Sequence, residues 1–212
     1  MMLLVNEIFH SIQGESSHAG KPCVFVRLTG CNLRCHYCDT MYAYDEGVSM
    51  SVEEVQEHVN RFQCGLVELT GGEPLLQKET PLLAEVLLKQ DKTVLVETNG
   101  SVNIDILPGN VIRIMDIKCP SSGEHKKMDW NNISRLTPQD EVKFVVANRV
   151  DFDWASEIVR SRHLESGCTV LFSPVTERLP PAVLSEWILE SGLNVRFQIQ
   201  LHKLLWPDQQ GK

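Results

Sequence analysis

The chain has 212 residues, of which 42% are hydrophobic and 23% charged, and its formal net charge is −8. These values fit one globular domain with a packed core, and they exclude a chain with too few apolar residues to fold. The acidic balance does not indicate a surface for direct binding of nucleic acid or of an anionic membrane. We expect a single domain over residues 1–212.

The N-terminal segment reaches Asn6 and Glu7 without the basic and apolar regions of a secretion signal. No apolar run approaches the ~18 residues of a membrane span. Three of the seven cysteines lie within eight residues. In a chain without an export signal, this pattern favours reduced thiols and metal binding over disulfides. We therefore expect a cytoplasmic protein.

Hydrophobic periodicity predicts strands that alternate with helices. In chain order the expected elements are strands Val5–Phe9 and Val24–Leu28, a polar loop over 31–44, a helix opening at Ser51, strand Leu66–Thr70, a helix around Leu82–Leu88, strands Thr93–Glu97, Val111–Lys118 and Val142–Val146, a helix over Asp153–Glu165, strand Thr169–Ser173, helix Pro181–Ser191 and strand Asn194–Gln200.

Two helices carry recognisable end signals. Ser51 and Glu54 have the spacing of a capping box, and Gly192 follows the helix that begins at Pro181. Strand and helix alternation indicates βαβ units with a parallel sheet. Because the helices are too few for eight repeats, we predict an α/β fold with a partial, incomplete TIM-like barrel of parallel strands.

Polar residues follow several of the predicted strands. The segments are Thr70–Pro74, Glu97–Gly100, Asp116–Lys118 and Ser173–Pro174. Ligand sites in parallel α/β folds lie at the carboxyl ends of strands. These segments therefore predict one shared pocket.

Cys31, Cys35 and Cys38 can converge on one face of a short loop. Thiolates select zinc or an iron–sulfur centre. A structural zinc site needs four ligands, whereas a cubane with three cysteines keeps one iron open for a chelating ligand. Candidates for a fourth ligand, none at a usual paired spacing, are Cys23, Cys64 and His36. A zinc-stabilised binding module without catalysis therefore stays an alternative.

The cysteine triad and Gly71-Gly72-Glu73-Pro74 together resemble the two motifs of the radical S-adenosylmethionine (SAM) superfamily. The resemblance implies a radical SAM core with fewer helices than a full barrel. It implies a [4Fe-4S] cluster held by the three cysteines. It also implies that SAM chelates the open iron and that the backbone at Gly72 holds the SAM amino group.

Further matches narrow the resemblance to the 7-carboxy-7-deazaguanine synthase family. They are Ile12–Glu15, Phe25–Leu28, Asp39-Thr40 and Gln200–Lys203. Membership implies a carbon–nitrogen lyase that converts 6-carboxy-5,6,7,8-tetrahydropterin to 7-carboxy-7-deazaguanine with release of ammonia, in queuosine and related deazapurine biosynthesis. It also implies catalytic use of SAM, a requirement for Mg²⁺, an electron donor of the reductase or flavodoxin type, and a homodimer.

The resemblance assigns roles to individual positions, with the hard chemistry carried by SAM rather than by a catalytic side chain. Thr40 is expected to bind Mg²⁺, which prefers hard oxygen ligands. Positions expected to bind SAM are Tyr37, Cys38, Asp39, Gly72, Asp116, Ile117, Lys118, Ser173, Pro174 and Val175. Positions expected to bind substrate are Ile12, Gln13, Gly14, Glu15, Arg27, Thr70, Glu97 and His202.

Arg27 lies among apolar strand residues, where a charge needs a partner, and a guanidinium suits a substrate carboxylate. The closest alternative activity is that of an activating enzyme that makes a glycyl radical on a partner protein. Whether the terminal Lys212 reaches the pocket stays open. The remaining cysteines, expected to fill the core or its walls, are Cys23, Cys64, Cys119 and Cys168.

Overall fold

The computed structural model describes residues 2–207 and 209–211. Within these residues, nine strands form one sheet in the order β3-β1-β2-β4-β5-β6-β7-β8-β9. The strands are β1 (Met2–Ile12), β2 (Pro22–Leu28), β3 (Val48–Ser51), β4 (Leu66–Gly71), β5 (Thr93–Thr98), β6 (Ile112–Asp116), β7 (Glu141–Val146), β8 (Thr169–Pro174) and β9 (Arg196–Phe197).

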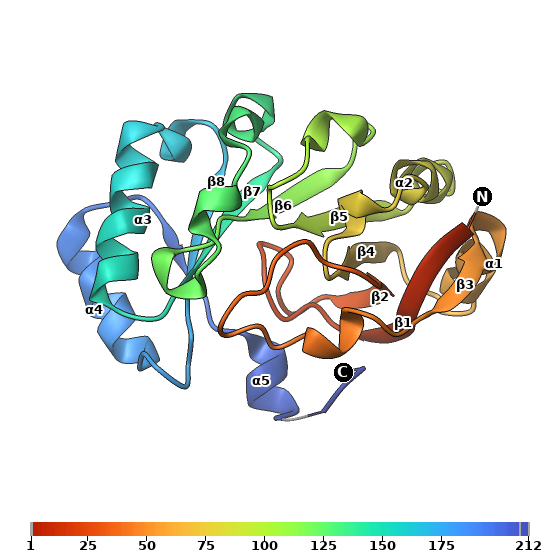
Figure 1. Cartoon of the computed structure of the whole chain (residues 1–212), viewed down its shortest axis with the longest axis horizontal. Helices are drawn as coiled ribbons and strands as arrows, with labels where there is room; N and C mark the ends of the chain where they lie inside the picture. The colour runs from red at the N-terminus through yellow and green to blue at the C-terminus, as the bar shows by residue number, and fades with distance from the viewer. Residues whose placement is uncertain (1, 208, 212) are drawn as a thin grey trace.

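From β2 to β9, neighbouring strands are parallel, whereas β1 pairs antiparallel with both β2 and β3. The sheet curves into an arch with β3 and β9 at its two edges (Figure 1). Because these edges do not pair within the described residues, the sheet is not closed. The predicted partial barrel of parallel strands is confirmed.

Side chains alternate between the two faces of the curved sheet. On β2, Val24 and Val26 are fully buried in the core, whereas Phe25 and Arg27 line a cavity on the concave face. On β4 the cavity-lining residues are Glu68 and Thr70. This period of two is the geometry of a strand with both faces covered, and it brings charged residues inside the arch.

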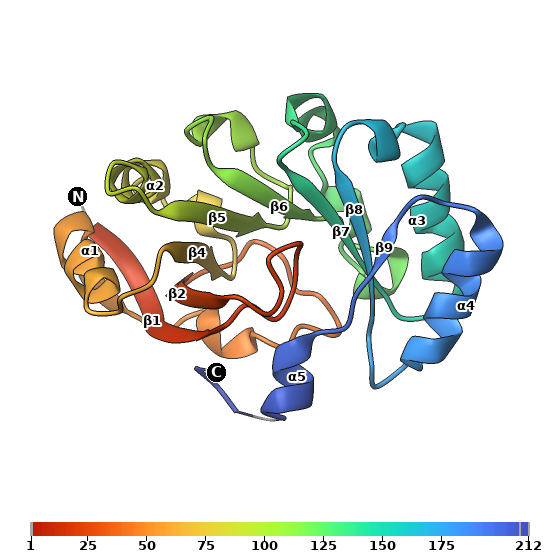
Figure 2. The same cartoon turned by 180° about the vertical axis from the view of Figure 1, so that it is seen from behind.

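Four helices lie on the outer side of the arch, and α5 (Leu201–Leu205) lies at its open side (Figures 1 and 2). The outer helices are α1 (Val52–Asn60), α2 (Thr80–Leu88), α3 (Arg149–Ser161) and α4 (Pro181–Ser191). Helices α1 and α2 contribute to one apolar core, and α3 and α4 to a second. None of the helices in the described part of the chain has the length and apolar character of a membrane span.

The predicted ends of two helices are confirmed. Ser51 accepts a hydrogen bond from the Glu54 N–H at 3.1 Å, and the Glu54 carboxylate accepts one from the Ser51 N–H at 2.7 Å. Gly192 follows α4 with φ 66°, the left-handed conformation that glycine adopts without strain.

The C-terminal strand prediction is wrong in its extent. Only Arg196–Phe197 forms strand, not Asn194–Gln200, and residues 201–205 form α5 instead. The Leu201 N–H donates to the Gly14 carbonyl at 3.0 Å. This bond holds the chain against the loop between β1 and β2, away from the sheet edge.

Other elements also differ from their predictions, including β1, which extends beyond the predicted Val5–Phe9, and β6, which is shorter than the predicted Val111–Lys118. The helix expected over Asp153–Glu165 runs from Arg149 to Ser161, because the Asn148 side chain accepts from the Asp151 N–H at 3.1 Å and caps the helix earlier. The edge strand β3 has no predicted counterpart, since a strand of four residues is too short for its alternation to be recognised.

The loop joining β1 to β2, residues 13–21, folds into the arch and reaches toward β7 and β9 (Figure 2). It closes on itself through hydrogen bonds of 2.8 Å between Gln13 N–H and Lys21 O and between Gly20 N–H and Gln13 O. The Ser17 N–H donates to both carboxylate oxygens of Glu141 on β7 at 3.1 Å. Glu141 is only 1% exposed, so it anchors this β1–β2 loop across the arch.

Candidate active site

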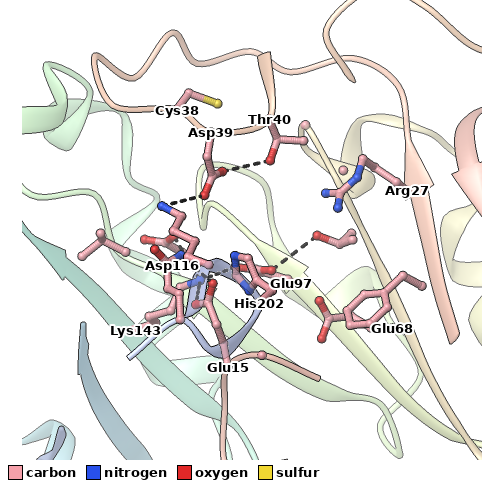
Figure 3. A pocket seen from close by; sticks show the side chains of 18 of the residues that line it. Glu15, Arg27, Cys38, Asp39, Thr40, Glu68, Glu97, Asp116, Lys143 and His202 are labelled. Atoms are coloured by element: carbon pink, nitrogen blue, oxygen red, sulfur yellow. Dashed lines mark hydrogen bonds and ion pairs between the residues drawn. The ribbon is translucent and has the colours of Figure 1, made fainter. Parts of the chain in front are cut away.

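A cavity of about 650 Å³ lies on the concave side of the sheet (Figure 3). This volume lies within the usual range for small-molecule sites. The cavity brings together most of the predicted site residues. They are Ile12, Gln13, Gly14, Glu15, Arg27, Cys31, Cys35, Tyr37, Cys38, Asp39, Thr40, Thr70, Gly72, Glu97, Asp116, Lys118, Val175 and His202.

Three predicted SAM positions do not line this cavity. Ile117 is fully buried in the second core, Ser173 is fully buried in β8, and Pro174 is buried beside it. Their neighbours Asp116, Lys118 and Val175 do line it. The cavity is therefore lined by Asp116 and Lys118 from the first segment and by Val175 from the second.

The cysteine loop fits an iron–sulfur cluster. Cys31, Cys35 and Cys38 are free, partly exposed and line the same cavity. Burial raises the pKa of Cys31, and raises that of Cys35 to about 11, while Lys118 opposes both changes. Binding to iron converts such thiols to thiolates, with release of their protons.

Two of the three candidate fourth ligands for zinc, Cys23 and Cys64, lie away from the cysteine loop. Cys23 begins β2 and Cys64 donates to the Pro22 carbonyl at 3.3 Å, so both lie at the opposite end of β2 from the cysteine loop. Among the described residues, no three His, Cys, Asp or Glu side chains converge on a site for a single ion. Cys23, Cys64 and Cys119 are buried and Cys168 is partly buried, as expected for core or wall residues.

The turn after β4 packs directly against the cysteine loop. A Cβ atom on Gly72 would lie 2.7 Å from the Cys31 Cβ, so only glycine permits this approach. Glu73 is fully buried and accepts hydrogen bonds from the Asn99 N–H at 2.6 Å and the Thr98 hydroxyl at 2.9 Å. Burial raises the pKa of Glu73 to about 7. The acidic residue of this motif thus joins the ends of β4 and β5.

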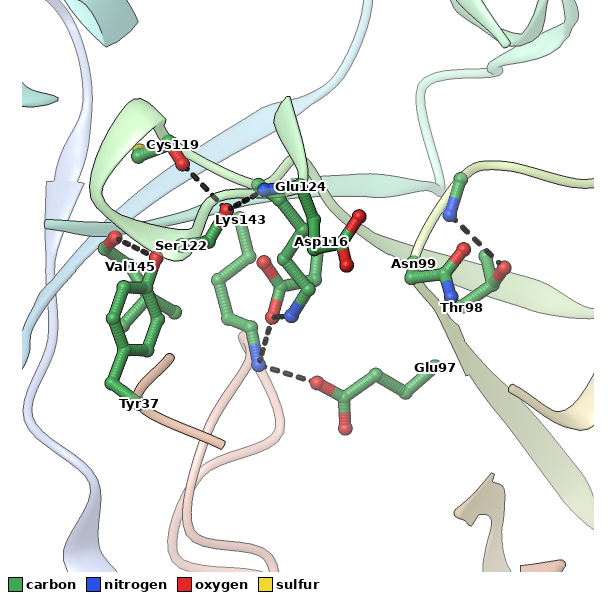
Figure 4. Close-up of polar contacts among 12 residues, drawn as sticks. Tyr37, Glu97, Thr98, Asn99, Asp116, Cys119, Ser122, Glu124, Lys143 and Val145 are labelled. Atoms are coloured by element: carbon green, nitrogen blue, oxygen red, sulfur yellow. Dashed lines mark hydrogen bonds and ion pairs between the residues drawn. The ribbon is translucent and has the colours of Figure 1, made fainter. Parts of the chain in front are cut away.

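Lys143 on β7 is the centre of an ion network (Figures 3 and 4). Its Nζ atom lies 2.7 Å from Glu15 Oε2 and 3.5 Å from Asp116 Oδ2, and it also pairs with Glu97. Although burial lowers the pKa of Lys143, these carboxylates raise it well above its ordinary value. The Lys118 Nζ binds Asp116 at 2.8 Å, so two lysines face three carboxylates in this network.

Glu68 and Gln13 form a polar pair in the cavity wall. Glu68 is 3% exposed, and the Gln13 amide donates to its carboxyl. Burial, reinforced by the charge of Glu97, raises the pKa of Glu68 well above its ordinary value. This direction favours the protonated carboxyl of Glu68, a form that can both donate and accept a hydrogen bond.

Arg27 has the partner that its apolar surroundings require. Its Nε donates to Glu7 Oε1 at 2.7 Å, and the Tyr42 hydroxyl donates to the same oxygen at 3.0 Å. The guanidinium carbon lies 5.8 Å from the Phe9 ring centre and 5.6 Å from that of Tyr42. Within the described residues only Nε of this guanidinium is hydrogen-bonded, so its terminal nitrogens are available to a ligand.

Thr40 lies beside two charged residues at the cavity rim (Figure 3). Its hydroxyl donates to Asp39 Oδ1 at 2.9 Å, and Asp39 Oδ2 lies 3.2 Å from Lys203 Nζ. A hydroxyl and a carboxylate are hard oxygen donors of the kind that Mg²⁺ accepts. The donor set therefore fits a magnesium ion that keeps waters or ligand oxygens in its other positions.

The C-terminal segment closes one side of the cavity. Gln200 donates to Glu15 Oε1 at 2.7 Å, and a Cβ atom on Gly14 would collide with the His202 ring. Burial would raise the pKa of Glu15, but Lys143 and His202 lower it below its ordinary value. Residues 207 and 209–211 also line the cavity. Lys212 lies outside the described residues.

Several residues that line the cavity were not predicted as site residues from the sequence. They are Tyr42, Glu68, Lys143 and Gln200. The sequence did contain a signal for two of them. Glu68 and Lys143 are charged residues inside otherwise apolar strands, and such residues need buried partners. Tyr42 and Gln200 carry no comparable signal.

Comparison with known proteins agrees with this site. The model of the Radical SAM superfamily matches residues 25–161, which include the cysteine loop and the turn after β4. The chain is thus a radical SAM protein. It is 42% identical to a 7-carboxy-7-deazaguanine synthase of Koribacter versatilis over 98% of this chain and 99% of that one. It is 44% identical to one of Chlorobaculum tepidum over 99% and 97%. The chain belongs to the 7-carboxy-7-deazaguanine synthase family.

A solved structure shares the fold. The crystal structure of QueE from Escherichia coli superposes with a TM-score of 0.79 at 21% sequence identity, and the match covers 94% of both chains. The open, mostly parallel sheet is therefore the architecture of a known protein as well as of this chain.

Proposed function

We propose that this chain converts 6-carboxy-5,6,7,8-tetrahydropterin to 7-carboxy-7-deazaguanine with release of ammonia, on the route to queuosine and related deazapurines. The observation that carries the proposal is that the cysteine loop and side chains suited to a pterin carboxylate line one cavity. Relatives named 7-carboxy-7-deazaguanine synthase, at 42% and 44% identity, support the same activity.

Cys31, Cys35 and Cys38 hold the cluster in this proposal, leaving one iron for SAM. When bound, the cluster and SAM supply abstraction of a hydrogen atom from the substrate. The chain's own residues bind and orient SAM. Asp116 Oδ1 is buried without a partner among the described residues and lies in the cavity wall, which provides an acceptor for a ligand. The further SAM contacts in this proposal are the cavity-lining residues Tyr37, Cys38, Asp39, Gly72, Lys118 and Val175.

The substrate is held by charge and by hydrogen-bond complementarity. The terminal nitrogens of Arg27 bind the pterin carboxylate while Glu7 fixes the guanidinium through Nε. The Gln13 amide and the Glu68 carboxyl supply hydrogen-bonding groups that match the amide edge of a pterin. Further substrate contacts in this proposal are Ile12, Gly14, Glu15, Thr70, Glu97 and His202.

Magnesium is the third component of the proposed site, beside the cluster with SAM and the substrate. Thr40 and its neighbour Asp39 are hard oxygen donors on the same cavity that Arg27 lines. Thr40 and Asp39 would hold the magnesium ion, which would supply an electrostatic partner for the substrate carboxylate that Arg27 binds.

The whole chain, residues 1–212, acts in this proposal as one radical SAM domain, and as a homodimer. The continuous sheet of the described residues supports the single domain. The proposed partners are the pterin substrate and a flavodoxin-type electron donor.

An anaerobic assay separates this function from its alternative. Protein with a rebuilt cluster is incubated with SAM, Mg²⁺, reductant and the carboxylated pterin, and the products are identified by mass. The proposal predicts 7-carboxy-7-deazaguanine, and none from the Cys35→Ala variant. Formation of 5′-deoxyadenosine only in the presence of a partner polypeptide would instead indicate a glycyl-radical activating enzyme.

A further inference from the structure

The polar segment that follows β5 contains a residue to which the proposed function assigns no role. Asn99 lies two positions after Glu97 and is 5% exposed, so its amide is largely shielded from water (Figure 4). Its Nδ2 atom lies 4.0 Å from Cys31 Sγ and 3.1 Å from Asn32 Oδ1. An asparagine at the end of one strand therefore reaches a proposed cluster ligand in another segment of the chain.

The orientation of this amide follows from its partners. The Ser101 backbone N–H, which can only donate, lies 3.0 Å from Asn99 Oδ1, and the Ser101 hydroxyl donates to the same oxygen at 2.6 Å. The nitrogen Nδ2 therefore faces the cysteine loop. One of its two N–H groups donates to Asn32 Oδ1, and the other is available to Cys31 Sγ.

Three side chains form a closed ring of hydrogen bonds that holds the amide in place. Asn99 donates to Asn32, the Asn32 amide donates to Ser101 Oγ at 2.8 Å, and Ser101 Oγ donates back to Asn99. The Asn99 backbone N–H is bound in addition to Glu73 at 2.6 Å. Because each bond in such a ring supports the others, the protein itself orients the amide.

The sulfur of Cys31 also receives a donor from its own loop. The Leu33 N–H lies 3.4 Å from Cys31 Sγ, and although burial raises the pKa of Cys31, this N–H opposes the change. For Asn99, 4.0 Å is the long end for a sulfur acceptor. The attraction between an N–H dipole and a negative charge declines gradually with distance and is stronger where water is excluded. Both donors therefore stabilise negative charge on this sulfur.

We propose that Asn99 is a positioning residue that raises the reduction potential of the cluster by directing its amide N–H at Cys31 Sγ. The inference rests on the proposed function, and it adds a residue that sets how readily the cluster accepts an electron. When one electron enters the oxidised cluster, the cluster and its cysteine sulfurs together become one charge more negative, and no bond is formed or broken. A donor aimed at a ligating sulfur stabilises this reduced form more than the oxidised form.

The test is a redox titration of protein with a rebuilt cluster, done anaerobically without SAM or pterin. Electron paramagnetic resonance measures the amount of reduced cluster at each applied potential. Asn99→Ala removes the donor, whereas Asn99→Asp keeps the size of the side chain and places a carboxylate near the sulfur. At a fixed potential we expect the ratio of reduced to oxidised cluster to fall about tenfold in Asn99→Ala, equivalent to about 59 mV for one electron. It should fall further in Asn99→Asp.

The matched control is Asn131→Ala, which removes an exposed amide that donates to Asp129 at 2.8 Å. Its reduction potential should equal that of the native chain, and the iron and sulfide contents of all four proteins should agree. A native potential in an Asn99 variant that holds a full cluster overturns the proposal.

Two further outcomes have distinct meanings. Loss of the cluster from both Asn99 variants, with native urea unfolding of the metal-free proteins, also overturns the proposal, since Asn99 would then hold the cluster rather than set its potential. Absence of a reducible cluster in the native chain would instead contradict the proposed function.

Discussion

Lys143 on β7 and Glu15 in the β1–β2 loop form an ion pair with 2.7 Å between Nζ and Oε2, although 128 residues separate them in the sequence. Lys143 also pairs with Glu97 on β5. One buried cation therefore holds the β1–β2 loop against two strands of the sheet. The same contacts position the Glu15 and Glu97 carboxyl groups in the cavity wall.

Replacement of Lys143 by Met should be strongly destabilising. The change leaves Glu15, Glu97 and Asp116 near one another without their shared cation, and loss of one partner from a buried pair costs about 3–5 kcal/mol. Urea unfolding of the metal-free protein measures this difference. The matched control is Arg149→Met, which breaks an exposed pair with Asp153 and should cost less than about 1 kcal/mol. Similar losses in the two variants would contradict a central role for Lys143.

Replacement of Glu141 by Ala should loosen the β1–β2 loop without affecting the cluster. Ser17 loses the carboxylate that anchors it, and the loop then has to be ordered when substrate binds. We expect the KM for the pterin to rise about tenfold, equivalent to about 1.4 kcal/mol, while the iron content and kcat change little. The exposed Glu157→Ala is the control. Unchanged KM together with lost iron would show that Glu141 acts on the cluster instead.

Replacement of Gly14 by Ala tests the contact between the β1–β2 loop and the C-terminal segment. The added Cβ collides with the His202 ring, so His202 has to shift from its position in the cavity wall. We expect kcat/KM to fall at least about tenfold, since displacement of positioning groups costs that much or more. Gly65→Ala is the same change at a glycine with open space around it, and it should stay within about twofold. Equal activity of both variants would refute the role of this contact.

Titration of the Glu73 carboxyl should make the free energy of unfolding depend on pH. Its pKa rises from 4.5 to about 7 on folding, so the folded state binds a proton more tightly than the unfolded state. The contribution of Glu73 to the free energy of unfolding is fully present below pH 4.5, and it is lost as the pH rises through 7. The difference between the two pKa values corresponds to a loss of unfolding free energy on the order of 3 kcal/mol.

Urea unfolding at pH 5 and pH 8 measures this loss. Glu73→Gln cannot ionise, so the fall in its unfolding free energy over this interval should be clearly smaller than in the native chain. Glu190→Gln, at an exposed position of α4, should behave as the native chain does. Parallel pH profiles for all three proteins would contradict the raised pKa.

Replacement of Thr40 by Ala should weaken activation by Mg²⁺. The variant loses the hydroxyl proposed as a ligand but keeps the three cysteines, so its iron and sulfide content should equal that of the native chain. Titration of activity with Mg²⁺ measures the effect, and we expect at least a tenfold higher concentration for half-maximal activity. An unaltered titration curve would count against the assignment of Thr40.

The sequence predicted what depends on local pattern. Cys31, Cys35 and Cys38 lie within one loop, and the capping box of Ser51 and Glu54 spans four residues, so each can be recognised without the fold. Lys143 and Glu68 could be noticed only as charges in apolar strands. Their partners come from other strands and from the β1–β2 loop, so the network required the three-dimensional arrangement.

The C-terminal segment was predicted least well for the same reason. Apolar residues of the segment 194–200 suggested a full strand, but the bond from Leu201 N–H to Gly14 draws the chain toward the β1–β2 loop. Such a competition between a sheet edge and a distant loop is not encoded in local periodicity.

The most direct test of the proposed chemistry is the ratio of product formed to SAM consumed, measured anaerobically with excess carboxylated pterin. Because SAM is regenerated in the proposed cycle, the account predicts many molecules of 7-carboxy-7-deazaguanine for each SAM lost, identified by mass. No deazapurine, or one SAM destroyed for each product molecule, would contradict it.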